Sequence, residues 1–338
     1  MKTALNGNTY TGSATNYNNL RTWYAGFLAA DKVMPTAGFL RIKGVASGRY
    51  LTCEASASKS DRLGASATAE TNTIFYLDGN KLLGYKTGYY TTATCEAGTL
   101  STTPQTYTFN VPSTLGEFSI KGGGFLYSWT DDSKMYFDRN GNTYANECHM
   151  YIEDVTELPV TITSAGYATL YAPVALTIPT GVTAYIATDK GEYLTLTAIE
   201  GGVIPANTGV ILNGDEGTYN FGITTGGSAG SNALTGTVAA IARPSGSYIL
   251  STSTDHGVGF YKDGVQTIPG FKSYLSAEAA VGVRGFLGFN FDDPTAISVI
   301  EAAMNAGKAI YDLSGRRVEN PTNGLYIVNG KKVFINKK

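Results

Sequence analysis

The 338-residue sequence is poor in the residues that most often carry catalysis and metal binding: it has two histidines, three cysteines and only 15% charged residues. The histidines, His149 and His256, belong to no Gly-x-Ser-x-Gly, His-Glu-x-x-His or P-loop pattern. His149 directly follows Cys148, and neighbours on a strand point to opposite faces, so the two are a poor nucleophile–base pair. We therefore predict no catalytic residues, although two glycosidase carboxylates can come from distant strands and leave no local motif.

The cysteines Cys53, Cys95 and Cys148 have no CxxC or CxxH spacing, so we predict no metal site and no cofactor. Cys53 and Cys95 stand in matching copies of Thr-Cys-Glu-Ala, and we interpret them as small buried residues at equivalent strand positions. A Cys53–Cys95 disulfide is the alternative. The segment 138–142 is interpreted as a solvated turn, because the glutamate of a calcium-binding EF-hand is not in place.

Long apolar runs and basic clusters are also missing. No run of roughly 18 apolar residues occurs, so we expect no membrane-spanning segment. The net charge is −2, and the only basic pairs are Lys331-Lys332 and Lys337-Lys338, so nucleic acid is not an expected partner. The N-terminal residues have no apolar h-region, so we expect no signal peptide in this chain.

The residues that are abundant favour strands and tight turns. The chain has 41 glycines and 23 tyrosines, and 43% of its residues are hydrophobic, which indicates an all-β protein that buries real cores. One stretch differs: apolar residues of 18–34 follow the i, i+3, i+4, i+7 spacing of an amphipathic helix that Pro35 ends. We interpret residues 1–37 as a loop and one short helix at the end of an upstream region.

A short segment recurs three times in the first half of the chain. Its copies are Gly48-Arg49-Tyr50-Leu51-Thr52, Gly88-Tyr89-Tyr90-Thr91-Thr92 and Gly124-Phe125-Leu126-Tyr127-Ser128. Their spacings are 88 − 48 = 40 and 124 − 88 = 36 residues. A repeat of this length marks an architecture in which no unit buries its apolar face alone. We predict that residues 38–157 form a β-trefoil, in which three units close a barrel.

The opening of this module resembles a known family. Phe39-Leu40-Arg41-Ile42-Lys43-Gly44, leading into the first copy, is similar to the start of ricin-like β-trefoil domains of bacterial secreted proteins, which often bind glycans. The family's Gln-x-Trp signature is replaced here by Ser128-Trp129-Thr130. Sugar binding needs an aromatic face and fixed polar groups, so the candidate ligand-binding residues come from the second and third copies. They are Tyr89, Tyr90, Trp129, Asp131 and Asp132. The alternative is that these aromatic side chains belong to the core and its hairpin cap.

Residues 158–295 predict a second, β-sandwich-like domain. Alternating runs such as 182–186 and 193–197 read as strands around the turn at 189–191. The segments 166–170 and 201–212 resemble a β domain that recurs in large surface proteins of Bacteroidota-type bacteria. That resemblance implies no activity. The segment Asp255-His256-Gly257 is interpreted as a turn rather than as an acid–base pair.

Residues 296–338 predict a small C-terminal β module. Gly324-Leu325-Tyr326-Ile327-Val328 and Lys332-Val333-Phe334-Ile335 flank Asn329-Gly330, the strongest short-range hairpin signal. With the preceding Tyr-Asp-Leu-x-Gly-Arg-Arg-Val, this pattern resembles the C-terminal sorting domain of type IX secretion substrates. The resemblance implies that the secretion machinery is a partner of residues 309–338 and that the protein is exported. The alternative is a small β module that caps the preceding domain.

The sequence thus predicts an exported, non-catalytic protein at the cell surface or in the medium, which binds a glycan or another surface ligand. Two alternatives remain open. One is a structural spacer without a ligand of its own, and the other is an accessory part of a glycoside hydrolase.

Overall fold

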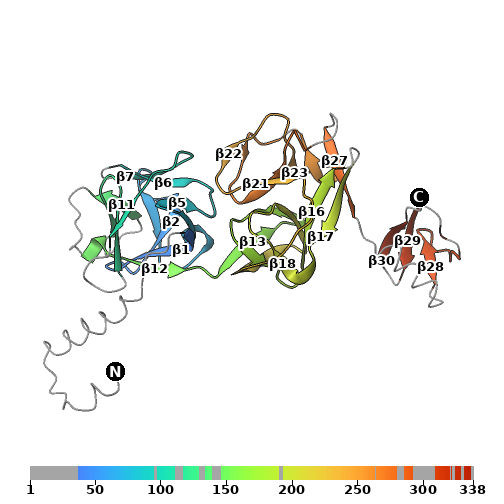
Figure 1. The fold of residues 1–338 in the computed structure, drawn as a ribbon, viewed down its shortest axis with the longest axis horizontal. Coiled ribbons are helices and arrows are strands. Elements are labelled where there is room, and N and C mark those ends of the chain that lie inside the picture. Colours follow the sequence, from blue (N-terminus) through green and yellow to red (C-terminus); the bar gives the residue numbers. More distant parts are fainter. Residues whose placement is uncertain are drawn as a thin grey trace, which may run out of the picture.

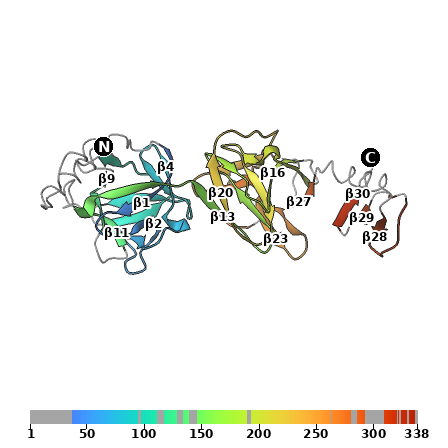
Figure 2. The same ribbon diagram turned by 90° about the horizontal axis from the view of Figure 1, so that it is seen from below.

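The computed structural model describes residues 37–338, except 95–96, 111–116, 129–133, 139–145, 190–192, 263, 280–284, 292–308, 320, 322–323, 329–330 and 336–338. The described chain is nearly all β, as the composition predicts, and three 3-10 helices of three residues each interrupt the strands. Figures 1 and 2 show three groups of strands that follow one another along the chain. The amphipathic helix predicted within residues 1–37 lies outside the described residues. No helix in the described part is long and apolar enough to cross a bilayer.

The first unit is a single 12-stranded sheet that curls into a barrel-like ring. β1 pairs with both β4 and β12, so the first and last strands of the unit meet. A hydrogen bond of 2.8 Å from the Tyr107 amide to the Asn80 carbonyl joins the residues that immediately precede β8 and β5. The strands are β1 (Ala37–Gly44), β2 (Tyr50–Ala55), β3 (Leu63–Ser66), β4 (Phe75–Asp78), β5 (Lys81–Gly84), β6 (Tyr90–Thr94), β7 (Ala97–Ser101), β8 (Thr108–Asn110), β9 (Glu117–Lys121), β10 (Phe125–Ser128), β11 (Lys134–Asp138) and β12 (Met150–Asp154), with η1 (Thr71–Thr73) and η2 (Asn146–Cys148).

The three repeats are hairpins of unequal length, and this accounts for part of their unequal spacing. In the first two, the Gly48 and Gly88 amides donate to the Gly44 and Gly84 carbonyls, and both of the later glycines have φ near +70° (66° and 70°). Strand pairing joins Lys43 to Tyr50 and Leu83 to Tyr90, but Lys121 to Phe125. The third loop is therefore three residues shorter. Phe125, not Leu126, is the structural counterpart of Tyr50 and Tyr90, one residue earlier than the sequence alignment places it.

Alternation along the strands fills the barrel. In β1, Leu40 and Ile42 point into the core, whereas Arg41 and Lys43 between them are half-buried on the outside. Cys53 is a free thiol within the same core, packed so closely on Gly84 that a Cβ there would lie 2.2 Å from the Cys53 Cβ. Burial raises the pKa of the Cys53 thiol, as expected for a structural cysteine. Cys95 lies outside the described residues.

The second unit has two sheets that face each other across one core. The four-stranded sheet has the order β13-β20-β15-β18, and the seven-stranded sheet has the order β14-β19-β16-β17-β27-β24-β23. Two small pairs, β21–β26 and β22–β25, complete it. The elements are β13 (Glu157–Ile162), β14 (Tyr167–Leu170), β15 (Ala175–Thr177), β16 (Val182–Asp189), β17 (Tyr193–Ala198), η3 (Glu200–Gly202), β18 (Val203–Ile204), β19 (Val210–Gly214), β20 (Gly217–Thr224), β21 (Leu234–Thr237), β22 (Ile241–Ala242), β23 (Ile249–Ser253), β24 (Gly257–Tyr261), β25 (Thr267–Ile268), β26 (Lys272–Leu275) and β27 (Phe286–Phe291).

The larger sheet is buried on both faces at its centre. Val210 and Leu212 of β19 pack against the smaller sheet, whereas Ile211 between them packs on the opposite side with Phe260 and Leu275. This explains why β19 begins as an uninterrupted apolar run instead of an alternating one. The predicted turn at Asp255–Gly257 is confirmed, because it joins β23 to β24 in a hairpin.

The third unit is a three-stranded sheet of β28 (Ile310–Asp312), β29 (Gly324–Val328) and β30 (Lys331–Ile335). Val328 pairs with Lys331, so the predicted hairpin with a two-residue connection is confirmed. Asp312 explains the spacing of the preceding motif: its carboxylate accepts bonds of 2.9 Å from the amides of Ser314 and Arg316 and from the Arg316 Nε. Gly315 has a φ of 79° in the turn that this carboxylate closes.

We expect Asp312→Asn to loosen the third unit in a pH-dependent way. The bond from the Arg316 amide, together with those from its guanidinium and the Ser314 amide, holds the pKa of Asp312 below its usual value. A lowered carboxyl pKa stabilises the fold above the unfolded pKa of about 3.9, and this contribution is lost as the pH falls through the folded pKa. Hydrogen exchange at neutral pH should be faster at the Ser314 and Arg316 amides in Asp312→Asn. The exposed Glu319→Gln is the charge-matched control, and equal exchange in both variants would contradict this assignment.

Candidate functional site

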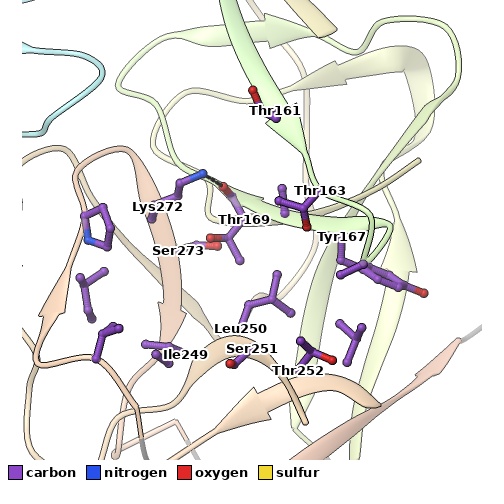
Figure 3. Close-up of a pocket in the computed structure, with 16 residues that line it drawn as sticks. Thr161, Thr163, Tyr167, Thr169, Ile249, Leu250, Ser251, Thr252, Lys272 and Ser273 are labelled. Carbon is purple, nitrogen blue, oxygen red and sulfur yellow. Dashed lines mark hydrogen bonds between the residues drawn. The ribbon is translucent and has the colours of Figure 1, made fainter. Parts of the chain in front are cut away.

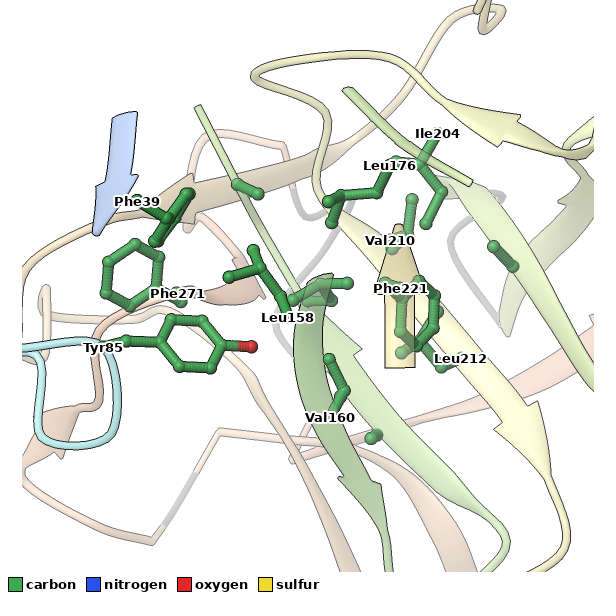
Figure 4. Packing of buried hydrophobic residues seen from close by; sticks show 14 of the residues in the cluster. Phe39, Tyr85, Leu158, Val160, Leu176, Ile204, Val210, Leu212, Phe221 and Phe271 are labelled. Atoms are coloured by element: carbon green, nitrogen blue, oxygen red, sulfur yellow. The ribbon is translucent and has the colours of Figure 1, made fainter. Parts of the chain in front are cut away.

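Aromatic side chains join the first unit to the second. Phe271 of the second unit inserts its ring among three rings of the first, with centroid separations of 5.6 Å to Phe39, 6.4 Å to Tyr76 and 5.0 Å to Tyr85. Figure 4 shows Phe271 beside Phe39 and Tyr85. These rings continue into the core of the second unit through residues such as Leu158. One hydrophobic core therefore spans both units.

Backbone contacts reinforce this junction. The Ala240 amide donates to the Gly88 carbonyl at 2.7 Å, and the Tyr85 hydroxyl donates to the Pro159 carbonyl at 3.1 Å. Gly88 and Gly270 lie so close that a Cβ on Gly88 would be 2.4 Å from the Gly270 nitrogen. Burial raises the pKa of the Tyr85 phenol, which stays neutral as a hydrogen-bond donor. The two units therefore meet without room for a side chain at Gly88.

The predicted ligand-binding residues do not form one described site. Tyr90 is half-buried and packs against the core of the junction, and burial raises the pKa of its phenol. Tyr89 is half-buried in the hairpin loop before it, where its amide donates to the Thr87 hydroxyl. Trp129, Asp131 and Asp132 lie outside the described residues. Among the five candidate residues, Tyr90 therefore uses its ring for contacts within the protein.

A comparison of equivalent positions in the three repeats explains why the aromatic residue of the second copy is not on an open surface. Lys43 lies over the ring of Tyr50, with its amine 4.8 Å from the ring centroid, and Lys121 lies 5.3 Å from that of Phe125. The second copy has Leu83 at the lysine position, paired with Tyr90 and fully buried in the junction. A lysine there would place a charge in the aromatic core, so the exchange of Lys for Leu marks the face that contacts the second unit.

The first copy instead presents an open cluster of aromatic and polar groups, Lys43, Tyr50, Tyr151 and Glu153, which we call the outer-face cluster. The Tyr50 hydroxyl donates to Glu153 Oε2 at 3.0 Å, and the Lys43 amine donates to the Tyr50 hydroxyl at 3.4 Å. Tyr151 pairs with Lys43 on the neighbouring strand, and 38% of its surface is exposed. The cluster combines the exposed ring of Tyr151 and the half-buried ring of Tyr50 with donors and acceptors in fixed positions.

A second arrangement of titratable groups lies beside this cluster. His149 Nδ1 and Glu117 Oε2 are 2.8 Å apart, and both side chains are only 9% exposed. The Tyr151 hydroxyl donates to Glu117 Oε1 at 3.4 Å. His149 lies just before β12, not within a strand as the argument against a Cys148–His149 pair assumed, and it contacts a buried carboxylate. No group of three or more metal-ligating side chains occurs in the described part of the chain.

The second unit contains a half-open cavity of about 420 Å³, within the range of small-molecule sites. Threonine and tyrosine side chains of the β13–β14 region form one wall, and β23 together with β26 forms the other (Figure 3). The Lys272 amine lies between the walls and donates to the Thr169 carbonyl at 3.2 Å. Burial lowers the pKa of Lys272, and no carboxylate of the described residues forms an ion pair with it.

Comparison with known proteins adds little about this chain. No family model matches it, and no curated protein matches it. Among solved structures, it is similar to a designed 3-fold symmetric protein, ThreeFoil, at 15% identity and a TM-score of 0.28. That match covers 35% of this chain and 99% of the designed protein. A likeness of this strength leaves any function to be argued from the chain's own residues.

Sequence reasoning missed both the outer-face cluster and the cavity lysine. Tyr50 stands in the first copy of the repeat, and its alternation with Leu51 marks it as the outward residue. Glu153 and Tyr151 come from the far end of the unit, and only the pairing of β1 with β12 brings them to Lys43. Lys272 follows the junction residues Gly270 and Phe271, and no motif distinguishes it.

Proposed function

We propose that this chain is an exported, non-catalytic protein whose first unit is a β-trefoil that binds glycans. The outer-face cluster carries this proposal, because it combines the exposed ring of Tyr151 and the half-buried ring of Tyr50 with a carboxylate and an ammonium held by mutual hydrogen bonds. A pyranose places its apolar face on a ring and its hydroxyls on such fixed polar groups. Glu153 and Lys43 supply one acceptor and one donor beside Tyr50.

The proposal extends to the rest of the chain. We take residues 38–157 as the trefoil, 158–295 as a sandwich-like domain and 296–338 as a sorting module that the type IX secretion machinery recognises through residues 309–338. The resemblance of the last segment to type IX sorting domains supports export to the cell surface or medium. The turn closed by Asp312 gives that motif a structural reason for its aspartate, glycine and arginine.

A glycan array with the wild-type chain and Tyr50→Ala tests the glycan proposal. We expect binding that Tyr50→Ala weakens by about tenfold or more, because a ring central to a small interface typically contributes at least 1–2 kcal/mol. Tyr311→Ala is the matched control, since Tyr311 is 40% exposed and lies in the third unit. Circular dichroism of each variant shows whether the fold is intact.

The sequence-predicted site is tested in the same array with Trp129→Ala. If Trp129→Ala abolishes binding and Tyr50→Ala does not, the site lies in the third repeat, as the sequence predicts. If the wild-type chain binds no glycan, the glycan form of the proposal is wrong.

The junction favours a second function, that of a structural spacer. The continuous aromatic core and the Gly88–Gly270 contact fix the first unit on the second, as a rigid spacer requires. Unlike the glycan proposal, this one predicts no ligand for the first unit. Small-angle scattering of residues 37–291 in solution tests it, and a particle that bends between the two units would contradict it.

A further inference from the structure

Lys272 occupies an unusual position in the second unit. Its amine lies on the wall of the cavity with the Thr169 carbonyl as its bonded acceptor, although an ammonium has three donors to satisfy. Lys272 is half-buried, and burying an ammonium is unfavourable unless an opposite charge accompanies it. No carboxylate among the described residues supplies that charge. Lys86, which lines a neighbouring hollow together with Lys272, is already paired with Glu54 at 2.7 Å.

The remainder of the cavity is apolar. Its aliphatic lining comes mainly from the β23–β25 side, and the residues are Ile249, Leu250, Val258, Val265 and Ile268. Val265 is 57% exposed and places uncovered apolar surface at the cavity. The opposite wall carries the hydroxyls of Thr161, Thr163 and Thr169 (Figure 3). A ligand with an apolar body and one anionic end would therefore fit the cavity, with its body on the aliphatic wall and its anionic end on the Lys272 ammonium.

The cavity also continues toward the junction. Lys272, Thr161 and Pro269 line it and line a second, smaller hollow whose far side is formed by Tyr85 and Lys86 of the first unit. Lys272 is thus placed between the apolar cavity and the junction. A head group bound to its amine would lie beside the junction, with the apolar body extending away toward β23 and β24.

We propose that this cavity is a binding site for an amphipathic carboxylate, with the carboxylate paired to the Lys272 ammonium and an aliphatic body against the β23–β25 wall. The ligand supplies the counter-charge that the described protein residues do not. This site lies in the second unit and is independent of the glycan proposal, so either can fail without the other.

Titration calorimetry of the full chain with sodium decanoate, decan-1-ol and decyltrimethylammonium tests the proposal. We expect decanoate to bind at least about tenfold more tightly than the alcohol, and the cation not to bind, because only the carboxylate pairs with Lys272. Shortening decanoate to octanoate should weaken binding by about fourfold per methylene removed, the value for apolar burial. These comparisons use the wild-type protein, so they do not depend on the folding of any variant.

Two substitutions locate the site. Lys272→Met keeps the aliphatic stem and removes the charge, so it should bring decanoate down to the affinity of the alcohol. Lys262→Met is the control, because Lys262 is in the same unit and does not line the cavity. Val258→Trp should block both decanoate and decan-1-ol, because Val258 lines the apolar part of the cavity. Equal affinity of decanoate and decanol for the wild-type chain, no decanoate binding, or a carboxylate preference that survives Lys272→Met would each overturn the proposal.

Discussion

Gly88→Ala will uncouple the first two units, whereas Gly48→Ala will leave them joined. Both glycines end equivalent hairpin loops, with φ of 70° and 66°, so alanine meets the same backbone strain at each. Only at Gly88 does a Cβ also collide with backbone, at 2.4 Å from the Gly270 nitrogen and 3.0 Å from the Ala240 nitrogen. At Gly48 nothing lies within 4 Å. Comparing the two variants therefore separates the effect of the junction contact from the conformational cost of placing alanine at a positive φ.

The same comparison gives the expected loss of stability for each variant. Alanine in the left-handed region costs roughly 1–2 kcal/mol, and overpacking adds about 1–3 kcal/mol where backbone cannot move aside. We expect Gly48→Ala to lower the melting temperature of a single cooperative transition. Gly88→Ala should lower it further and split it into two transitions in a calorimetric scan, because each unit then unfolds by itself. Equal shifts without splitting would show that Gly88 does not couple the units.

The all-β, barrel-like character of the first unit could be predicted because a repeat of about 40 residues restricts the possible folds more strongly than any single strand does. The function of individual copies could not. Tyr90 is equivalent to Tyr50 by spacing and by register, but it contacts the second unit instead of solvent. The sequence does distinguish the two copies, because Leu83 in the second copy stands where the first copy has Lys43. The meaning of this change becomes clear only when the residues that face the position are known.

The candidate sites were hidden for a related reason. Glu153 reaches Tyr50 across 103 residues of sequence, through the strand pairing that closes the ring. Lys272 reaches the Thr169 carbonyl across the same separation of 103 residues, because β14 and β26 are neighbours in the fold. A sequence pattern records neighbours along a strand, whereas these contacts depend on which strands the whole fold brings together. Local turns such as Asp255–Gly257 were predictable because all their determinants lie within a few residues.

Phe271→Ala will remove the centre of the junction. Phe271 is only 3% exposed, and it is one of two non-glycine residues with positive φ, at 58°, in the described part of the chain. A bulky residue in this conformation is strained, so the surrounding structure must hold it. The Tyr171 amide, which donates to the Phe271 carbonyl at 3.0 Å, and the rings of Phe39 and Tyr85 do so.

The expected loss is about 3–5 kcal/mol, the usual cost of truncating a buried phenylalanine. It should appear as separation of the unfolding transitions of the two units, because the ring contacts both. Phe260→Ala is the control: this residue is fully buried in the second core of the second unit and touches no part of the first. It should lower the stability of the second unit by a similar amount. In Phe271→Ala the first unit should unfold in a transition of its own, whereas unfolding of both units in one transition would show that the aromatic core is not what joins them.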